Sequence, residues 1–173
     1  ASWLDFEFDA KDILYVRIDR RRKFHATILL KALGNTEEKL LEYFYPFEKL
    51  DLSEVKPGED PEAQYYYRVL DPEILLNQRP QLPIADPKTG EVLVKSGQRI
   101  NKRLLKKLEN AKVKRVNATF HELKGRIIAR TLYKAGSEEI LVPCNTALTA
   151  ELLTTLVEND IKEVELLHIG PQN

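Results

Sequence analysis

One stretch of the chain occurs twice, and this internal repeat restricts the possible folds more than any other feature of the sequence. Residues 91–116 align with residues 139–164 at a constant offset of 48 and without a gap. Each copy predicts a strand, a turn, a helix and a second strand, with Asn101 and Thr149 as the helix N-caps. Because two copies are too few for a solenoid, we expect two small β-rich modules packed together. The apolar positions recur pair by pair: Val92/Ile140, Leu93/Leu141, Val94/Val142, Ile100/Leu148, Leu104/Leu152, Leu105/Leu153, Leu108/Leu156, Val113/Ile161 and Val116/Val164.

The two predicted helices differ in the charge of their polar faces. The second helix carries Glu151 and Glu158, whereas the polar face of the first is basic and consists of Lys102, Arg103, Lys106 and Lys107. Runs of charge most often face water and do nothing more. We therefore expect the cationic face to be solvated.

The first 45 residues predict a small α+β unit. Apolar and polar residues alternate over 4–8 and again over 14–19, with turn residues between them, which predicts an antiparallel hairpin. Residues 26–33 predict a short apolar helix, and Asn35 or Thr36 is the expected cap of a second helix. A unit of this size is too small for a large core of its own, so we expect it to pack on a neighbour.

A change of composition follows. Residues 46–86 contain six of the nine prolines of the chain. Within them, residues 64–70 (QYYYRVL) are rich in strand formers and predict a strand. We expect its three tyrosines to pack at a sheet edge rather than to stack on nucleic-acid bases, because basic residues do not alternate with them.

Four adjacent cations, Arg20, Arg21, Arg22 and Lys23, follow Asp19 and the strand that contains Arg17. Four neighbouring positive charges repel one another, so a nearby polyanion such as a phosphate backbone would make them favourable. The alternative is a solvated surface turn. The chain as a whole is neutral, with 27 Lys+Arg against 27 Asp+Glu, whereas a dedicated nucleic-acid-binding domain is usually clearly basic. Any contact with nucleic acid should therefore be local.

The residues that commonly carry out catalysis or bind metals are sparse. The three histidines are far apart in the sequence, and Cys144 is the only cysteine. No glycine-rich phosphate-binding motif occurs. We therefore expect no catalytic constellation, no metal site and no cofactor, and we expect Cys144 to be a small, half-buried residue.

The sequence also contains no methionine, no secretory signal and no apolar run of the ~20 residues needed to span a bilayer. With a single cysteine no internal disulfide can form, which favours a reducing, cytoplasmic setting. We expect the chain to be a segment of a longer polypeptide.

The N-terminal stretch resembles the beta subunit of bacterial DNA-directed RNA polymerase. The resemblance covers about 45 residues and rests on WLDFEFD (residues 3–9), RIDRRRK (residues 17–23) and the segment that begins at residue 26. The matching region is the lobe domain, one wall of the downstream DNA channel. Gly170-Pro171 resembles the point where the chain returns to the lobe, and the repeat-bearing middle is similar in location to a lineage-specific insertion built from barrel-sandwich-hybrid modules.

This resemblance implies roles for individual residues. Trp3 occupies the position of a tryptophan that stacks on a base of the non-template strand. The basic residues become candidates for contacts with DNA phosphates or with sigma factor, and Asp19 and Arg17 become supporting residues. The implied partners are DNA, the beta-prime and alpha subunits and sigma factor. Because the metal ligands of the active site lie in the other large subunit, the segment should be inactive alone although it is part of a nucleotidyltransferase. The candidate DNA-binding set is Trp3, Arg20, Arg21, Arg22 and Lys23.

The expected fold class is α+β: an antiparallel hairpin with two short helices, followed by a β-rich insertion with two repeated modules like barrel-sandwich hybrids. The expected domains are residues 1–45 as part of the lobe, residues 46–167 as the insertion, and residues 168–173 as the return to the lobe. The repeats lie near residues 86–116 and 134–164.

One alternative function remains open. The insertion can instead be a protein-interaction module that docks transcription factors without contacting DNA, which fits the neutral net charge. A free-standing carrier domain is disfavoured, because such domains present a modifiable lysine in a Met-Lys-type motif and this chain has no methionine.

Overall fold

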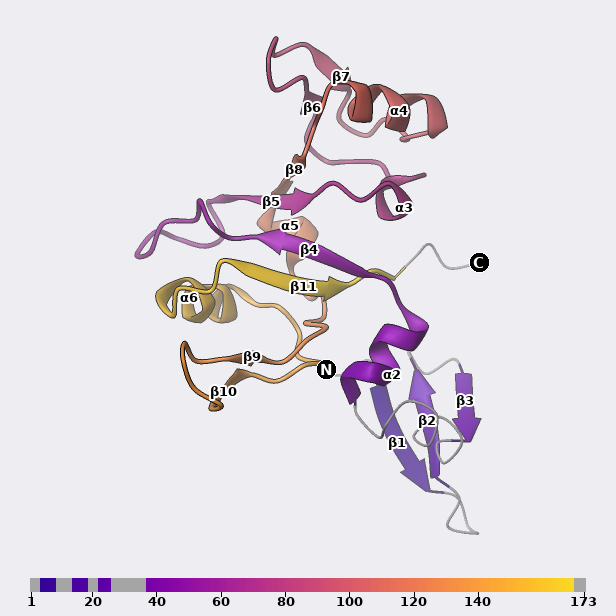
Figure 1. Ribbon diagram of the computed structural model, residues 1–173, viewed down its shortest axis with the longest axis vertical. Coiled ribbons are helices and arrows are strands. Elements are labelled where there is room, and N and C mark those ends of the chain that lie inside the picture. Colours follow the sequence, from indigo (N-terminus) through magenta and orange to yellow (C-terminus); the bar gives the residue numbers. More distant parts are fainter. Residues whose placement is uncertain (1–3, 9–13, 19–21, 26–36, 170–173) are drawn as a thin grey trace. The chain divides into compact units, whose positions relative to one another are not determined.

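The computed structural model describes residues 4–8, 14–18, 22–25 and 37–169 (Figure 1). By packing, the chain divides into two compact units. Unit 1 comprises Ala1–Phe47, Gly125–Leu148 and Glu165–Asn173, and unit 2 comprises Glu48–Lys124 and Thr149–Val164. The expected division into a lobe (residues 1–45 and 168–173) and an insertion (residues 46–167) is a different one and stays a prediction.

The N-terminal part of unit 1 is a three-stranded antiparallel sheet. It consists of β1 (Leu4–Phe8), β2 (Leu14–Ile18) and β3 (Arg22–His25), in the order β1-β2-β3. The predicted hairpin is thereby confirmed. Strand β3 was not predicted from the sequence, because its residues lack the alternation that marks a strand. The helix predicted over residues 26–33 lies outside the described residues.

The remainder of unit 1 packs around helix α2 (Glu37–Phe44), which begins where the sequence predicted. Its buried residues Leu40 and Leu41 form a core with four buried residues from elsewhere in the unit, namely Ile127, Ala129, Cys144 and Leu167. A short antiparallel pair, β9 (Leu132–Tyr133) and β10 (Ile140–Val142), completes the unit. Among the described residues no helix is both long and apolar enough to cross a membrane.

A four-stranded sheet has the strand order β11-β4-β5-β8. Its strands are β4 (Phe47–Asp51), β5 (Tyr65–Val69), β8 (Arg115–Thr119) and β11 (Glu163–Leu167). The strand predicted over residues 64–70 is confirmed, but its expected place at a sheet edge is wrong, because β5 pairs with β4 on one side and with β8 on the other. Burial alternates along it: Tyr66 is fully buried whereas Tyr65 is 64% exposed.

Unit 2 has an apolar core under helix α4 (Lys102–Asn110). Leu104, Leu105 and Leu108 form the predicted apolar stripe and are all buried. They pack with residues of α3 (Pro72–Leu75), β6 (Ile84–Ala85), β7 (Val92–Val94) and β8. This core is separate from the one around α2, so each unit has its own apolar interior.

The internal repeat is confirmed element by element. Strand β7 corresponds to β10, α4 to α6 (Ala150–Glu158) and β8 to β11, each pair separated by the offset of the sequence alignment. Both predicted N-caps are present: the side-chain oxygens of Asn101 and Thr149 accept hydrogen bonds from the backbone N–H groups of Leu104 and Leu152. In α6, Leu153 and Leu156 are buried, as in α4.

The structural repeat also begins earlier than the sequence repeat. Helix α3 corresponds to α5 (Phe120–Leu123), and β6 corresponds to β9, again at the same offset. The backbone hydrogen bonds recur as well. The N–H of Asn77 donates to the Ile100 carbonyl at 2.7 Å, and the N–H of Gly125 donates to the Leu148 carbonyl at 2.8 Å. Each copy of the structural repeat is therefore about twenty residues longer than the repeat that the sequence alignment shows.

Three pairs of equivalent residues have positive φ angles in both copies, namely Asn77/Gly125, Gly97/Asn145 and Lys112/Asp160. In the first two pairs one copy uses glycine and the other asparagine, the two residue types that enter this region most easily. Lys112 and Asp160 follow the ends of α4 and α6. There the N–H groups of Val113 and Ile161 donate to the carbonyls of Leu108 and Leu156, as in a Schellman motif.

Candidate nucleic-acid interface

The basic run lies at the end of β2, across a connection and into β3. Arg17 is in β2, and Arg22 and Lys23 begin β3. Trp3, Asp19, Arg20 and Arg21 lie outside the described residues. The structure therefore places three of the seven predicted site residues on strands of the same small sheet.

The strand register brings three charged positions into one row. Arg17 is the direct partner of Asp5 on β1 and of Lys23 on β3, and Arg22 is the partner of Ile18. Partners in an antiparallel pair have Cβ atoms about 4.5–5.5 Å apart. Arg17 and Lys23, six residues apart in the sequence, are thus register partners, and Asp5 is the partner of Arg17 on its other side.

A second group of polar residues in unit 1 surrounds the start of α2. The Glu37 carboxylate accepts a hydrogen bond from Asn145 Nδ2 at 3.2 Å and lies 3.8 Å from Cys144 Sγ. The Glu38 carboxylate accepts a hydrogen bond from the Thr131 N–H. The two carboxylates thus tie the first turn of α2 to the segment around β9 and β10.

Cys144 has the environment of a structural thiol. Its side chain is buried, and its N–H donates to Thr131 Oγ1 at 3.1 Å. Burial raises the pKa of the thiol, and the nearby Glu37 and Glu38 carboxylates raise it further. Because the thiolate is the nucleophilic form, this environment disfavours reactivity. The described residues contain no group of three or more His, Cys, Asp or Glu side chains that could hold a metal ion.

Arg130 is a further cation of unit 1, and carboxylates neutralise it. Its guanidinium forms ion pairs with Glu165 and, at 3.6 Å, with Glu42, and it lies 5.0 Å from the centre of the Phe47 ring. These ion pairs could not be predicted from the sequence, because the acidic partners are 88 and 35 residues away from Arg130 in the chain. Arg130 therefore acts as a structural residue within unit 1.

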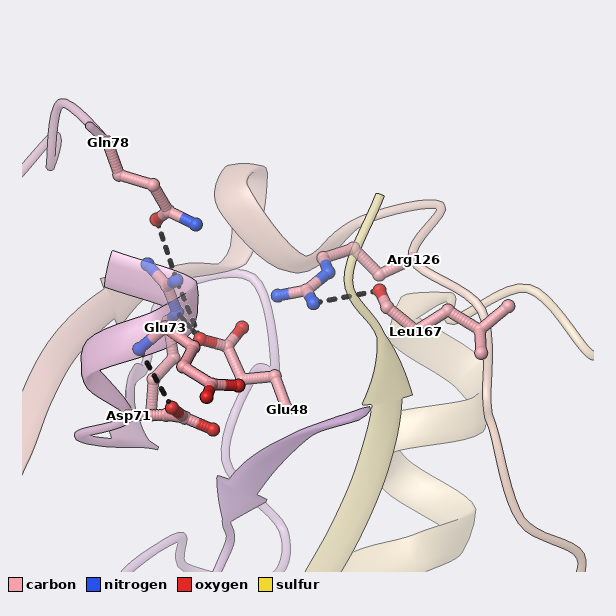
Figure 2. Close-up of polar contacts among 7 residues, drawn as sticks. Glu48, Asp71, Glu73, Gln78, Arg126 and Leu167 are labelled. Atoms are coloured by element: carbon pink, nitrogen blue, oxygen red, sulfur yellow. Dashed lines mark hydrogen bonds and ion pairs between the residues drawn. The ribbon is translucent and has the colours of Figure 1, made fainter. Parts of the chain in front are cut away.

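Unit 2 contains a buried ion pair. Arg68 on β5 donates to Glu48 Oε2 from Nε at 3.0 Å and from Nη2 at 2.7 Å, and Nη2 also donates to Gln78 Oε1 at 2.8 Å. The dashed lines that end at Glu48 and Gln78 in Figure 2 mark these contacts. The two charged side chains are 1% and 7% exposed. This pair joins β4 to β5 and is inaccessible to a ligand.

Two backbone contacts in Figure 2 have similar structural roles. The Asp71 carboxylate caps α3 by accepting from the Glu73 N–H at 3.1 Å, and Arg126 Nη2 donates to the Leu167 carbonyl at 3.0 Å. Asp71 and Thr119 are equivalent N-caps of the repeat. These two contacts position backbone.

The fold and the site define a mixed α/β module with antiparallel sheets, short helices and a basic strand. No protein-family model matches the chain. Over all 173 residues it is 42% identical to the DNA-directed RNA polymerase subunit beta of Desulfotalea psychrophila and 43% identical to that of Syntrophobacter fumaroxidans. Over 132 residues, 76% of the chain, it is 48% identical to the same subunit of Bdellovibrio bacteriovorus.

The chain spans 12% of the length of the first two relatives and 9% of the third. The resemblance seen in the N-terminal residues is thereby confirmed and extends over the whole chain. Over its whole length the chain is therefore similar to a segment of the beta subunit of DNA-directed RNA polymerase.

Proposed function

We propose that this chain is a non-catalytic segment of the RNA polymerase beta subunit that contributes to DNA-directed RNA synthesis. The observation that supports this most strongly is the match of all 173 residues to subunits of that name. In this proposal the segment works in the cytoplasm together with beta-prime, alpha and sigma subunits, uses no cofactor of its own and is inactive alone.

Within the subunit, residues 1–45 are the proposed lobe segment and residues 46–167 the proposed insertion. The two copies of the repeat are proposed to be modules related to barrel-sandwich hybrids, which the common strand, helix and turn pattern of both copies supports. The lobe segment is proposed to line the downstream DNA channel.

The proposed contacts with DNA or sigma factor come from the basic run. Arg22 and Lys23 begin a strand that pairs with β2, where Arg17 is the partner of Lys23. A sheet that carries several cations close together is favoured by a neighbouring phosphate backbone. Trp3 is proposed to stack on a non-template base, an interaction worth roughly 1–3 kcal/mol without base specificity.

The test is to reverse the charge of Arg20, Arg21 and Arg22 to glutamate in the assembled polymerase and to measure the lifetime of the open complex over a range of salt concentrations. We expect a shorter lifetime and a weaker salt dependence, because each lost phosphate contact removes about 0.9 from the log–log slope. A matched control reverses three exposed lysines elsewhere, namely Lys49, Lys56 and Lys124. A lifetime equal to that of the control at every salt concentration would remove the DNA-contact role.

The second candidate function is docking of a transcription factor by the insertion, which the net charge of zero favours. The same variants separate the two candidates. Capture of a purified regulator without DNA, at equal affinity by the parent and by the charge-reversed chain, would favour docking.

A further inference from the structure

The polar face of helix α4 is a concentrated positive charge that the fold itself does not use. Its four cations are Lys102, Arg103, Lys106 and Lys107, here called the α4 basic face, and all four are exposed. At roughly 100° per residue they lie within an arc of about 140°. The opposite side of the helix carries the buried leucines, so the charged side points to solvent.

These cations have no acidic partner among the residues that the structure describes. The ion pairs of unit 2 are formed by Lys49, Arg68, Arg115 and Lys162. Asp51 and Glu54 are both engaged by Arg115. The charge of the α4 basic face is therefore available to an external anion.

The arrangement is unfavourable for the helix itself. Lys102 and Arg103 lie in the first turn, which contains no acidic residue and where the helix dipole repels cations. Lys102 and Lys106, like Arg103 and Lys107, are four residues apart, a spacing at which like charges repel. Lysine and arginine are good helix formers, but propensity does not account for four cations of one sign on one face.

The second copy of the repeat shows that the fold does not require it. The equivalent positions in α6 are Ala150, Glu151, Thr154 and Thr155, and α6 has the same length, the same type of N-cap and the same C-terminal motif. In α6 this face is half-buried at three of the four positions, and Thr154 lines a small pocket with residues of the loop after β4, among them Val55 and Gln64. The face of α4 is open.

The chemistry of the face fits a phosphate backbone better than a protein surface. Residues 91–119 contain no aromatic side chain, and the exposed part of α4 is charged or polar throughout. The centres of protein–protein interfaces are depleted in lysine and enriched in aromatic residues. Phosphate contacts, in contrast, use lysine and arginine and need no aromatic side chain. The lack of aromatic residues also disfavours single strands, which are bound by stacking.

We infer that the α4 basic face is a second nucleic-acid contact of this chain, which binds the phosphate backbone of duplex DNA without reading its sequence. The choice of DNA as the polyanion rests on the proposed function. The site itself is distinct from the basic run at residues 20–23, because it belongs to unit 2. At about 14 Å in length, α4 spans the rise of about four phosphates on one strand.

The test transfers the polar face of α6 to α4 in the full 173-residue chain. The swap variant carries Lys102→Ala, Arg103→Glu, Lys106→Thr and Lys107→Thr. A control variant has the same change in net charge, but its four substitutions are at separate exposed positions: Lys49→Thr, Lys56→Ala, Lys124→Glu and Lys162→Thr. Binding of a short fluorescent DNA duplex is measured by anisotropy over a sodium chloride series, and circular dichroism verifies folding.

We expect the swap variant to bind at least about tenfold more weakly than the control at low salt, with a log–log salt slope smaller by about 3–4. Equal affinity and slope in the two variants would overturn the inference, as would displacement of the duplex by polyglutamate of matched charge more effectively than by unlabelled duplex. If the swap variant does not fold, Lys106→Thr alone should still lower the slope by about 0.9, and an unchanged slope would overturn the inference. If the swap variant loses binding while reversal of Arg20, Arg21 and Arg22 leaves the open-complex lifetime unchanged, the inference for α4 is supported. Only the contact proposed for the basic run is then rejected.

Discussion

At the scale of single residues, the buried pair of Arg68 and Glu48 shows how a charge is held inside unit 2. Glu48 is 1% exposed, and two nitrogens of Arg68 donate to one of its oxygens. Removing only one partner takes charge-assisted contacts away from a group that stays buried, which costs far more than the pair contributes as a unit. The contacts therefore fix the pairing of β4 and β5 more than they add net stability.

We predict that Arg68→Met destabilises the chain by about 3–5 kcal/mol and that adding Glu48→Leu restores most of the loss. The free energy of unfolding in urea, followed by circular dichroism, measures both variants. A double variant that is no more stable than Arg68→Met would show that packing of the arginine, and not the loss of its contacts with Glu48, determines the cost.

Tyr66 is the largest fully buried side chain among the residues with described burial, and its hydroxyl donates to the Pro61 carbonyl at 2.6 Å. Burial, with a smaller contribution from the negative charge of Asp60, raises the pKa of Tyr66 from its ordinary value of 10.0 to about 12. Folding thus favours the neutral phenol. The resulting stability is fully present below the pKa of the unfolded state and is lost as the pH rises through that of the folded state.

We predict that the free energy of unfolding falls by up to about 2.5 kcal/mol from about pH 10 to about pH 12 because of this one residue. Tyr66→Phe should reduce this alkaline decline, at a cost of about 1 kcal/mol near neutral pH for the lost hydrogen bond. Tyr65→Phe, at a position that is 64% exposed, is the control and should change neither quantity. An alkaline decline of the same size in Tyr66→Phe and in the parent chain would contradict the prediction.

At the scale of elements, the repeat is maintained by backbone conformation as much as by apolar side chains. Gly97 and Asn145 occupy equivalent turns of the two copies, with positive φ angles of 77° and 64°. A Cβ at Gly97 would meet no atom within 4 Å. The cost of a substitution there therefore comes from the backbone alone.

We predict that Gly97→Asn changes stability by less than about 0.5 kcal/mol and that Gly97→Val lowers it by about 1–2 kcal/mol, because only the asparagine adopts a positive φ readily. The equivalent test at Gly125, whose counterpart is Asn77, should give the same order of stabilities. Thermal unfolding of the four variants measures both pairs. Equal stabilities for the asparagine and valine variants would show that these turns do not constrain the fold.

The sequence revealed the strong helices of the repeat but not its full length. The leucines of α4 and α6 recur at helical spacing, so the alignment of residues 91–116 with 139–164 was visible directly. Helices α3 and α5 share length, capping and hydrogen bonds but differ in residue type, PEIL against FHEL. A backbone pattern that several residue types satisfy equally well leaves little trace in an alignment.

At the scale of the whole chain, the packing units do not coincide with the copies of the repeat. Residues 71–116 of the first copy lie in unit 2, whereas the equivalent residues 119–164 of the second copy are divided, with Gly125–Leu148 in unit 1 and the others in unit 2. The core of unit 1 combines Leu40 and Leu41 with Ile127 and Leu167, residues from three separate stretches of the chain. Such groupings depend on long-range packing, which local patterns do not encode.

The candidate site shows the same division. Clustering of Arg20 to Lys23 and the neutral charge of the whole chain can be read from the sequence, because they depend only on which residues are adjacent. The row formed by Asp5, Arg17 and Lys23 required the register of three strands, and the pairing of Arg130 with Glu165 and Glu42 required the fold of unit 1.

The sequence by itself determined the strands and helices with strong periodicity, the N-caps Asn101 and Thr149, the repeat and the resemblance to a polymerase subunit. All of these depend on residues that are close in the chain or on a fixed spacing. Only the tertiary structure decided which strand lies inside the sheet, which charges are neutralised by an ion pair and which remain exposed to solvent. The reason is that partners such as Arg68 and Glu48 meet only when distant segments pack and exclude water.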